Sequence, residues 1–119
     1  IGAAIASPDK EVVCITGDGS FQMSLPELAT CANYNLNIKI MILNNGYLGM
    51  VRQLQEKLCD SRYSETKISN PDFIKLAESY NIKALRVTNV NEIIPALEKA
   101  FSTDETFLID FTVEPMEVL

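Results

Sequence analysis

The sequence contains no histidine, and this absence excludes several kinds of catalytic site. No histidine in this chain can activate a serine or cysteine nucleophile. A zinc site built on the chain's own imidazoles is excluded for the same reason. Any site in this chain therefore depends on other polar side chains.

Basic residues are also scarce. The chain has 10 lysines and arginines against 16 aspartates and glutamates, which gives a net charge of −6. No block of basic residues interrupts this balance, so we expect neither nucleic acid nor an anionic membrane surface as a partner. No apolar run approaches the ~20 residues that a membrane-spanning helix needs.

Cysteine is limited to Cys14, Cys31 and Cys59. The number is odd, and the spacing is not that of a metal site. Cys14 falls in an expected strand and Cys31 in an expected helix, where a buried free thiol is the usual outcome. Free thiols indicate a reducing cytoplasm.

The length and composition suit one globular domain. The chain has 119 residues, of which 47% are hydrophobic and 22% charged; a domain of this size buries roughly two-thirds of its unfolded surface. The chain opens on Ile1-Gly2 rather than on methionine or a signal peptide. We therefore expect residues 1–119 to be a piece of a longer chain, truncated at its N-terminal side.

Strand and helix patterns alternate along the chain. Apolar runs predict strands over 11–16, 37–43, 85–87 and 107–113. Helical spacing and start signals predict helices over 1–7, 24–35, 50–58, 70–80 and 91–101. This alternation predicts an α/β fold with three layers, α/β/α, around a mostly parallel sheet.

Several helix starts can be assigned to named residues. Ser24 and Glu27 match a capping box. Asn70 and Asn91 are expected as N-caps of the helices that follow them. In the last strand, Asp110 is expected to lie at an edge or on a polar face rather than to bind a ligand.

The segment from 50 to 69 leaves alternatives open. Met50, Val51 and Leu58 follow helical spacing, and a core-facing position is expected for Leu58, whereas Met50 and Val51 could equally face a ligand. Residues 59–69 lack periodicity and form a long loop. That loop is either a lid over a site or a solvated excursion at the surface.

The chain is organised around two polar turns that follow apolar strands. The first holds Gly17-Asp18-Gly19-Ser20 and the second holds Asn44-Asn45. In a parallel α/β sheet, ligands bind beyond the carboxyl ends of the strands, so Asp18 and Asn45 should lie side by side. Carboxylate and amide oxygens suit Mg²⁺ or Ca²⁺ rather than zinc, and Mg²⁺ usually completes its coordination with water and substrate phosphates. The glycines and the Ser20 hydroxyl can approach phosphate oxygens, which predicts a metal–diphosphate site.

These turns and the residues around them resemble the thiamine diphosphate enzyme signature. The resemblance runs through Ile1-Gly2, Pro8, Val13, Ile15, residues 17–20 and Asn44-Asn45. The middle of the chain, at 43–53, 62–66 and 70–78, is similar to the large catalytic subunit of acetolactate synthase. The alternative is an α/β domain in which residues 17–20 form only a tight turn, which would not explain the spacing to Asn44-Asn45.

The resemblance implies roles for individual residues. Mg²⁺ would be bound by the side chains of Asp18 and Asn45 and by the carbonyl of Tyr47. The residues implied to line the diphosphate of thiamine diphosphate are Gly17, Gly19, Ser20, Gly46, Leu48 and Gly49. Met50 and Val51 would lie near the reactive end of the cofactor.

The family condenses two 2-oxo acids with loss of CO₂ from pyruvate, in branched-chain amino-acid biosynthesis. The resemblance places its activating glutamate in an N-terminal domain, across a subunit interface, so no catalytic residue is expected here and the isolated fragment should be inactive. It implies a homodimer or larger homo-oligomer and allows a regulatory small subunit. The alternatives are another 2-oxo-acid decarboxylase or oxidase, such as pyruvate oxidase, and a cofactor-binding module without carboligase activity.

Overall fold

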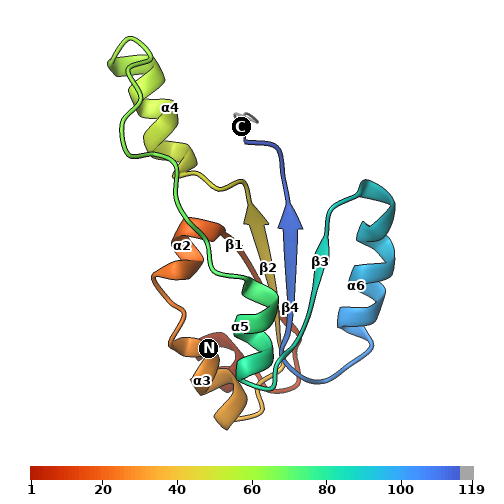
Figure 1. Ribbon diagram of the computed structural model, residues 1–119. Coiled ribbons are helices and arrows are strands. Elements are labelled where there is room, and N and C mark those ends of the chain that lie inside the picture. The colour runs from red at the N-terminus through yellow and green to blue at the C-terminus, as the bar shows by residue number, and fades with distance from the viewer. Residues whose placement is uncertain (116–119) are drawn as a thin grey trace.

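The structure is a computed structural model that describes residues 1–115. Four parallel strands form one sheet in the order β1-β2-β4-β3 (Figure 1). The strands are β1 (Val12–Gly17), β2 (Ile38–Asn44), β3 (Lys83–Val87) and β4 (Phe107–Thr112). The helices are α1 (Gly2–Ala6), α2 (Asp18–Gln22), α3 (Glu27–Asn33), α4 (Gly49–Leu58), α5 (Phe73–Ser79), the 3₁₀ helix η1 (Val90–Glu92) and α6 (Ile93–Phe101).

One face of the sheet is covered by α2, α3 and α5 (Figure 1). Alternate residues of β2, namely Ile38, Ile40 and Ile42, are buried in the same cluster as Phe73 and Ala77 of α5. Side chains of alternate residues point to the same side of a strand, which is why these isoleucines share one face. Burying each large apolar side chain stabilises the fold by about 1.5–3 kcal/mol.

The opposite face of the sheet is covered by α6 (Figure 1). Ala96 and Ala100 of α6 pack against Val87, Phe107 and Ile109 of the strands. Small residues on the helix let it approach β3 and β4 closely. The predicted α/β fold with three layers and a parallel sheet is thus confirmed.

The caps of two helices differ from the prediction. Asp72, not Asn70, caps α5, and its carboxylate accepts from the backbone N–H of Ile74 at 3.2 Å. Asn89, not Asn91, caps η1 in a capping box with Glu92. In both cases several polar residues follow one another, and local sequence alone does not decide which of them turns its side chain back to the helix.

Two further expectations are wrong because of strand order. Cys14 is exposed, because β1 lies at the edge of the sheet. Asp110 is fully buried, because β4 is an interior strand between β2 and β3. Cys31 is buried as expected, and burial raises the pKa of its thiol. Among residues 1–115, no helix has the length and apolar character to span a membrane.

Glu92 gives the fold a pH-dependent contribution. Its carboxylate accepts from the N–H groups of Thr88 at 2.9 Å and Asn89 at 3.1 Å, and these bonds lower the pKa of Glu92. The unfolded state therefore binds the proton more readily, so this stabilisation is present above the ordinary glutamate pKa and is lost as pH falls through the lower folded value. We expect Glu92→Gln to lose less stability than wild type between about pH 7 and about pH 3 in urea unfolding. Equal losses in the two proteins would contradict this.

Candidate functional site

The carboxyl ends of β1 and β2 bring the two polar turns together. The strands pair in parallel, with Gly17 opposite Leu43, so the residues that follow them emerge at the same edge of the sheet. Asp18 is 2% exposed, and its Oδ2 accepts from the backbone N–H of Gly46 at 2.8 Å, across 28 residues of sequence. The structure thus brings Asp18 to the turn that contains Asn45.

Residues 17–20 are not a free turn but the start of a helix. Gly17 has extended backbone angles and occupies the N-cap position of α2, which begins at Asp18. The N–H of Gly19 donates to Oδ1 of Asp18 at 3.0 Å. The strand ends at Gly17 and Asp18 opens the helix directly after it, which holds the Asp18 carboxylate at the sheet edge.

The turn after β2 is fastened by its own side chain and by a distant loop. Asn45 Oδ1 accepts from the N–H of Tyr47 at 2.9 Å, and Gly46 has a φ of +73°, which favours glycine. The N–H of Leu48 donates to the carbonyl of Thr66 at 2.8 Å, and Ile68 donates to that of Gly46 at 3.0 Å. The end of the 59–69 loop is therefore attached to this turn, whereas residues 60–65 of the loop are exposed.

Helix α4 projects away from the sheet (Figure 1). None of its residues is buried, and Leu58 is 76% exposed, so the core-facing position predicted for Leu58 is wrong. Met50 and Val51 are 77% and 42% exposed at the start of α4, next to the 44–48 turn. A helix that projects in this way cannot take its apolar stripe into the core of its own domain.

Polar residues outside both motifs complete the site. Asn70 Nδ2 donates to Asp18 Oδ2 at 2.7 Å and to Asn44 Oδ1 at 2.9 Å. Gln22 Nε2 donates to Asn70 Oδ1 at 2.6 Å. Sequence reasoning missed these contacts because Asn70-Pro71-Asp72 has the pattern of a helix start, which explained Asn70 without any distant partner.

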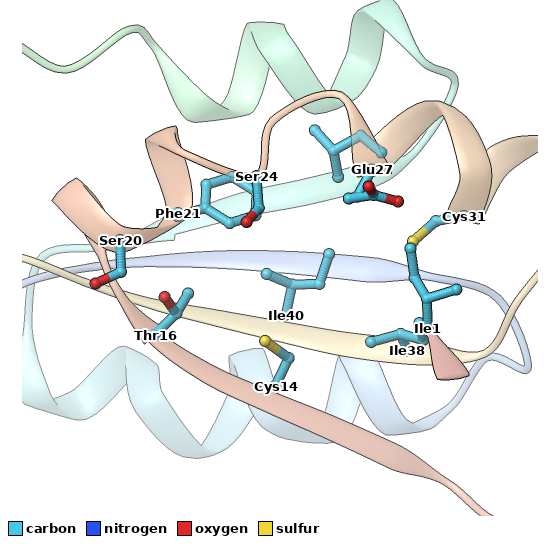
Figure 2. Close-up of a pocket in the computed structure, with 11 residues that line it drawn as sticks. Ile1, Cys14, Thr16, Ser20, Phe21, Ser24, Glu27, Cys31, Ile38 and Ile40 are labelled. Atoms are coloured by element: carbon cyan, nitrogen blue, oxygen red, sulfur yellow. The ribbon is translucent and has the colours of Figure 1, made fainter. Parts of the chain in front are cut away.

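Glu27 does not form the predicted capping box. Pro26 occupies the N-cap position of α3 without a side-chain cap, and the first turn is closed by the backbone bond from Glu27 to Ser24. Glu27 instead lines a cavity of about 460 Å³ between β1, α2 and α3. Figure 2 shows Cys31 near one end of this largely apolar cavity, and Thr16 and Ser20 at the other.

The oxygen groups at the sheet edge fit a magnesium ion with phosphate ligands. Within residues 1–115, no group of three or more histidine, cysteine, aspartate or glutamate residues could hold a metal. The edge instead offers the Asp18 carboxylate together with amide and carbonyl oxygens of the 44–48 turn. Such hard oxygens suit Mg²⁺, which leaves positions for water and phosphate oxygens. An added Cβ would meet no atom within 4 Å at Gly17 or Gly46, so both backbones border open space.

A family model described as "Thiamine pyrophosphate enzyme, C-terminal TPP binding domain" matches residues 1–111. The chain belongs to this family. The cofactor of this thiamine diphosphate-binding domain is accordingly thiamine diphosphate, which such enzymes use with Mg²⁺.

Two similar proteins are both named as acetolactate synthase large subunits. A probable acetolactate synthase large subunit of Methanococcus aeolicus is 48% identical over 120 residues, which is 100% of this chain and 20% of that protein. The acetolactate synthase isozyme 2 large subunit of Escherichia coli (strain K12) is 40% identical over 118 residues, 98% of this chain and 22% of that protein. The chain thus spans about a fifth of the length of these relatives.

A solved structure shares the fold of the domain. It is the thiamine diphosphate-dependent 4-hydroxybenzoylformate decarboxylase of Rhodococcus jostii RHA1, with a TM-score of 0.89 and 31% sequence identity. The match covers 96% of this chain and 22% of that protein. This thiamine diphosphate-binding domain thus resembles a domain that also occurs in a decarboxylase.

Proposed function

We propose that residues 1–119 form the C-terminal cofactor-binding domain of an acetolactate synthase large subunit. The complete enzyme would condense pyruvate with a second 2-oxo acid, with loss of CO₂. The observation that carries the cofactor part of this proposal is the contact between buried Asp18 and the turn after β2. The synthase assignment is supported by relatives of that name that are 40–48% identical over nearly the whole chain.

Within this proposal, three groups hold Mg²⁺. They are the side chains of Asp18 and Asn45 and the carbonyl of Tyr47. The bond from Tyr47 N–H to Asn45 Oδ1 supports this assignment, because it fixes the Asn45 amide with one oxygen lone pair still available. Amide and carbonyl oxygens add no negative charge, so the phosphate groups are not repelled by a second carboxylate.

The diphosphate would lie along both turns, against the open backbone of Gly17 and Gly46 and the first turn of α4. The residues proposed to line it are Gly17, Gly19, Ser20, Gly46, Leu48 and Gly49. The exposed side chains of Met50 and Val51 would lie toward the reactive end of the cofactor. When bound, thiamine diphosphate supplies the carbanion chemistry, and the residues of this chain bind and orient it.

The product distribution of the full-length protein tests this function. Pyruvate, Mg²⁺ and thiamine diphosphate should yield acetolactate, and 2-oxobutyrate as acceptor should yield acetohydroxybutyrate. The 119-residue chain alone should form neither, because it spans about a fifth of its relatives. Acetolactate formation by this chain alone would contradict the assignment of residues 1–119 as a cofactor domain that needs the rest of the enzyme.

A decarboxylase is the second candidate, and the likeness to the Rhodococcus enzyme favours it. A decarboxylase would release an aldehyde from the 2-oxo acid without forming a carbon–carbon bond. If the full-length protein releases acetaldehyde and no acetolactate, the synthase proposal is wrong and the cofactor assignment stands. If thiamine diphosphate binding is undetectable by calorimetry with Mg²⁺, the cofactor assignment is wrong as well.

The proposed assembly is a homodimer or larger homo-oligomer of the full-length enzyme, with a regulatory small subunit as a further candidate partner. Gel filtration with light scattering tests the first, and co-purification tests the second. A cytoplasmic location is proposed from the three cysteines, all of which are free thiols. A fluorescent fusion of the full-length protein would test the location directly.

A further inference from the structure

A chain of side-chain hydrogen bonds extends from the proposed metal ligand into the sheet. Asn70 bridges Asp18 and Asn44 through its Nδ2 group, at 2.7 and 2.9 Å. Asn44 Nδ2 in turn donates to Oδ1 of the buried Asp110 at 3.0 Å. Gln22 Nε2 donates to the remaining polar atom of Asn70, its Oδ1, at 2.6 Å. Every polar atom of the Asn70 amide is therefore used.

The carboxylates at the two ends determine the orientation of both amides. The Asp110 carboxylate accepts from Arg86 Nε and from Asn44, so Asn44 turns its Nδ2 toward Asp110 and its Oδ1 toward Asn70. Asn70 must then present Nδ2 to Asn44, and the same group reaches Asp18, which also only accepts. Turning the Asn70 amide over would place its oxygen against two acceptors at once.

This arrangement distinguishes the two oxygens of Asp18. Oδ2 accepts from Gly46 N–H at 2.8 Å and from Asn70 Nδ2 at 2.7 Å, which occupies both of its lone pairs. Among residues 1–115, Oδ1 accepts only from Gly19 N–H, at 3.0 Å. One lone pair of Oδ1 is therefore the only one of the carboxylate that these bonds leave for a metal ion.

We propose that Asn70 is a positioning residue for the metal site, which holds Asp18 so that it binds Mg²⁺ through Oδ1 alone. This inference rests on the proposed function, since it assumes that Asp18 is a metal ligand. A single carboxylate oxygen suits the small octahedral shell of Mg²⁺, whereas Ca²⁺ also accepts both oxygens of one carboxylate. The hydrogen bond from Asn70 Nδ2 to Asp18 Oδ2, called the Asn70 clamp below, thus favours Mg²⁺ over Ca²⁺ at this site.

A purely structural role for Asn70 gives different expectations. If Asn70 served only to start α5, replacing it would lower stability and leave metal affinity unchanged. The cap of α5 is Asp72, whose carboxylate accepts from Ile74 N–H and which makes no bond to Asp18. Asp72→Ala is therefore the control: it weakens the same segment and keeps every direct bond of Asn70, and it removes one of the two carboxylate partners of Arg86, the other being Asp110.

The test measures Mn²⁺ affinity by electron paramagnetic resonance in the full-length protein, with saturating thiamine diphosphate. Asn70→Leu keeps the approximate shape of the side chain but cannot donate, and it keeps water away from Asp18. We expect it to weaken Mn²⁺ binding by about 10- to 100-fold. Asn70→Ala admits a water that can donate to Asp18, so its loss should be smaller, and Asp72→Ala should bind like wild type.

A second measurement compares Ca²⁺ and Mg²⁺ as competitors for bound Mn²⁺. Asn70→Leu frees a lone pair on Oδ2 and lets the carboxylate bind through both oxygens, so this variant should shift relative affinity toward Ca²⁺. Asn70→Ala should shift it in the same direction but less, because the admitted water can be displaced by the ion. The Asp72→Ala control should keep the wild-type ratio. A general loss of stability would lower the affinity for all metal ions alike and would leave the ratio of Ca²⁺ to Mg²⁺ affinity unchanged. A change in this ratio therefore indicates the positioning role.

The outcomes separate this inference from the function on which it rests. If wild type binds Mn²⁺ only with thiamine diphosphate and the Asn70 variants match Asp72→Ala in affinity and ratio, the clamp is refuted and the cofactor site stands. If wild type does not bind Mn²⁺ with thiamine diphosphate, both are refuted. If Asn70→Leu does not fold, Asn70→Ala decides by the same two measurements.

Discussion

Replacing Asp18 with asparagine is expected to abolish the Mg²⁺-dependent binding of thiamine diphosphate. The substitution removes the negative charge of the proposed ligand. It also turns one oxygen into an N–H₂ group that must face either Gly19 N–H or the donors from Gly46 and Asn70. Changes to residues that only support a metal ligand cost about 10–100-fold in affinity, so we expect a loss of more than about 100-fold in calorimetry.

Asp9→Asn is the matched control, because it removes one negative charge from an exposed position outside the site. It should bind thiamine diphosphate as tightly as wild type does. For both variants the titration should be repeated with EDTA in place of Mg²⁺, to measure binding of the cofactor without the metal. If Asp18→Asn binds within a few-fold of wild type, Asp18 is not a metal ligand. The roles proposed for Asn45 and Tyr47 would then lose their main support.

Replacing Asp110 with alanine is expected to lower the free energy of unfolding more than the other substitutions proposed here. Asp110 is fully buried and accepts from Asn44 Nδ2 at 3.0 Å and from Arg86 Nε at 2.9 Å. Hydrogen bonds to charged groups contribute about 1.5–3 kcal/mol each, and unpaired buried partners add to the cost. Because the Arg86 side chain is 42% exposed and also pairs with Asp72, we expect a total of about 3 kcal/mol.

Urea unfolding measures this loss, with Asp9→Ala as the control for removing an aspartate from an exposed position. A loss below about 1 kcal/mol would show that water replaces both partners without penalty. Asp110→Ala should also weaken Mn²⁺ binding slightly. The reason is that Asn44 is then free to turn its amide and release Asn70.

The strands could be predicted from sequence because they are continuous apolar runs. A strand covered on both faces in a parallel sheet is apolar at nearly every position, and the run at 37–43 agrees with β2 within one residue. The end of α3 was also predictable, because Asn35 adopts a φ of +46° after the helix, a conformation that asparagine tolerates. These features depend only on neighbouring residues.

The contacts of Asn70 and the exposure of Leu58 could not be predicted from the sequence. Asn70 contacts Asp18 across 52 residues and Asn44 across 26, while its neighbours gave it the pattern of a helix cap. Leu58 follows the apolar spacing of a buried helix, yet α4 projects from the domain and leaves it exposed. An apolar stripe on a helix indicates that the stripe can be buried, but it does not identify the surface that buries it.

By itself, the sequence determined the alternation of strands and helices, the parallel α/β architecture and the two polar turns of a metal–diphosphate site, which a family resemblance assigned to thiamine diphosphate. These follow from backbone propensity and from side chains a few residues apart. Only the tertiary structure decided the order β1-β2-β4-β3, which buries Asp110 and exposes Cys14. It also decided that Asn70 holds Asp18, since a hydrogen bond between distant residues forms only where packing of the whole sheet brings donor and acceptor together.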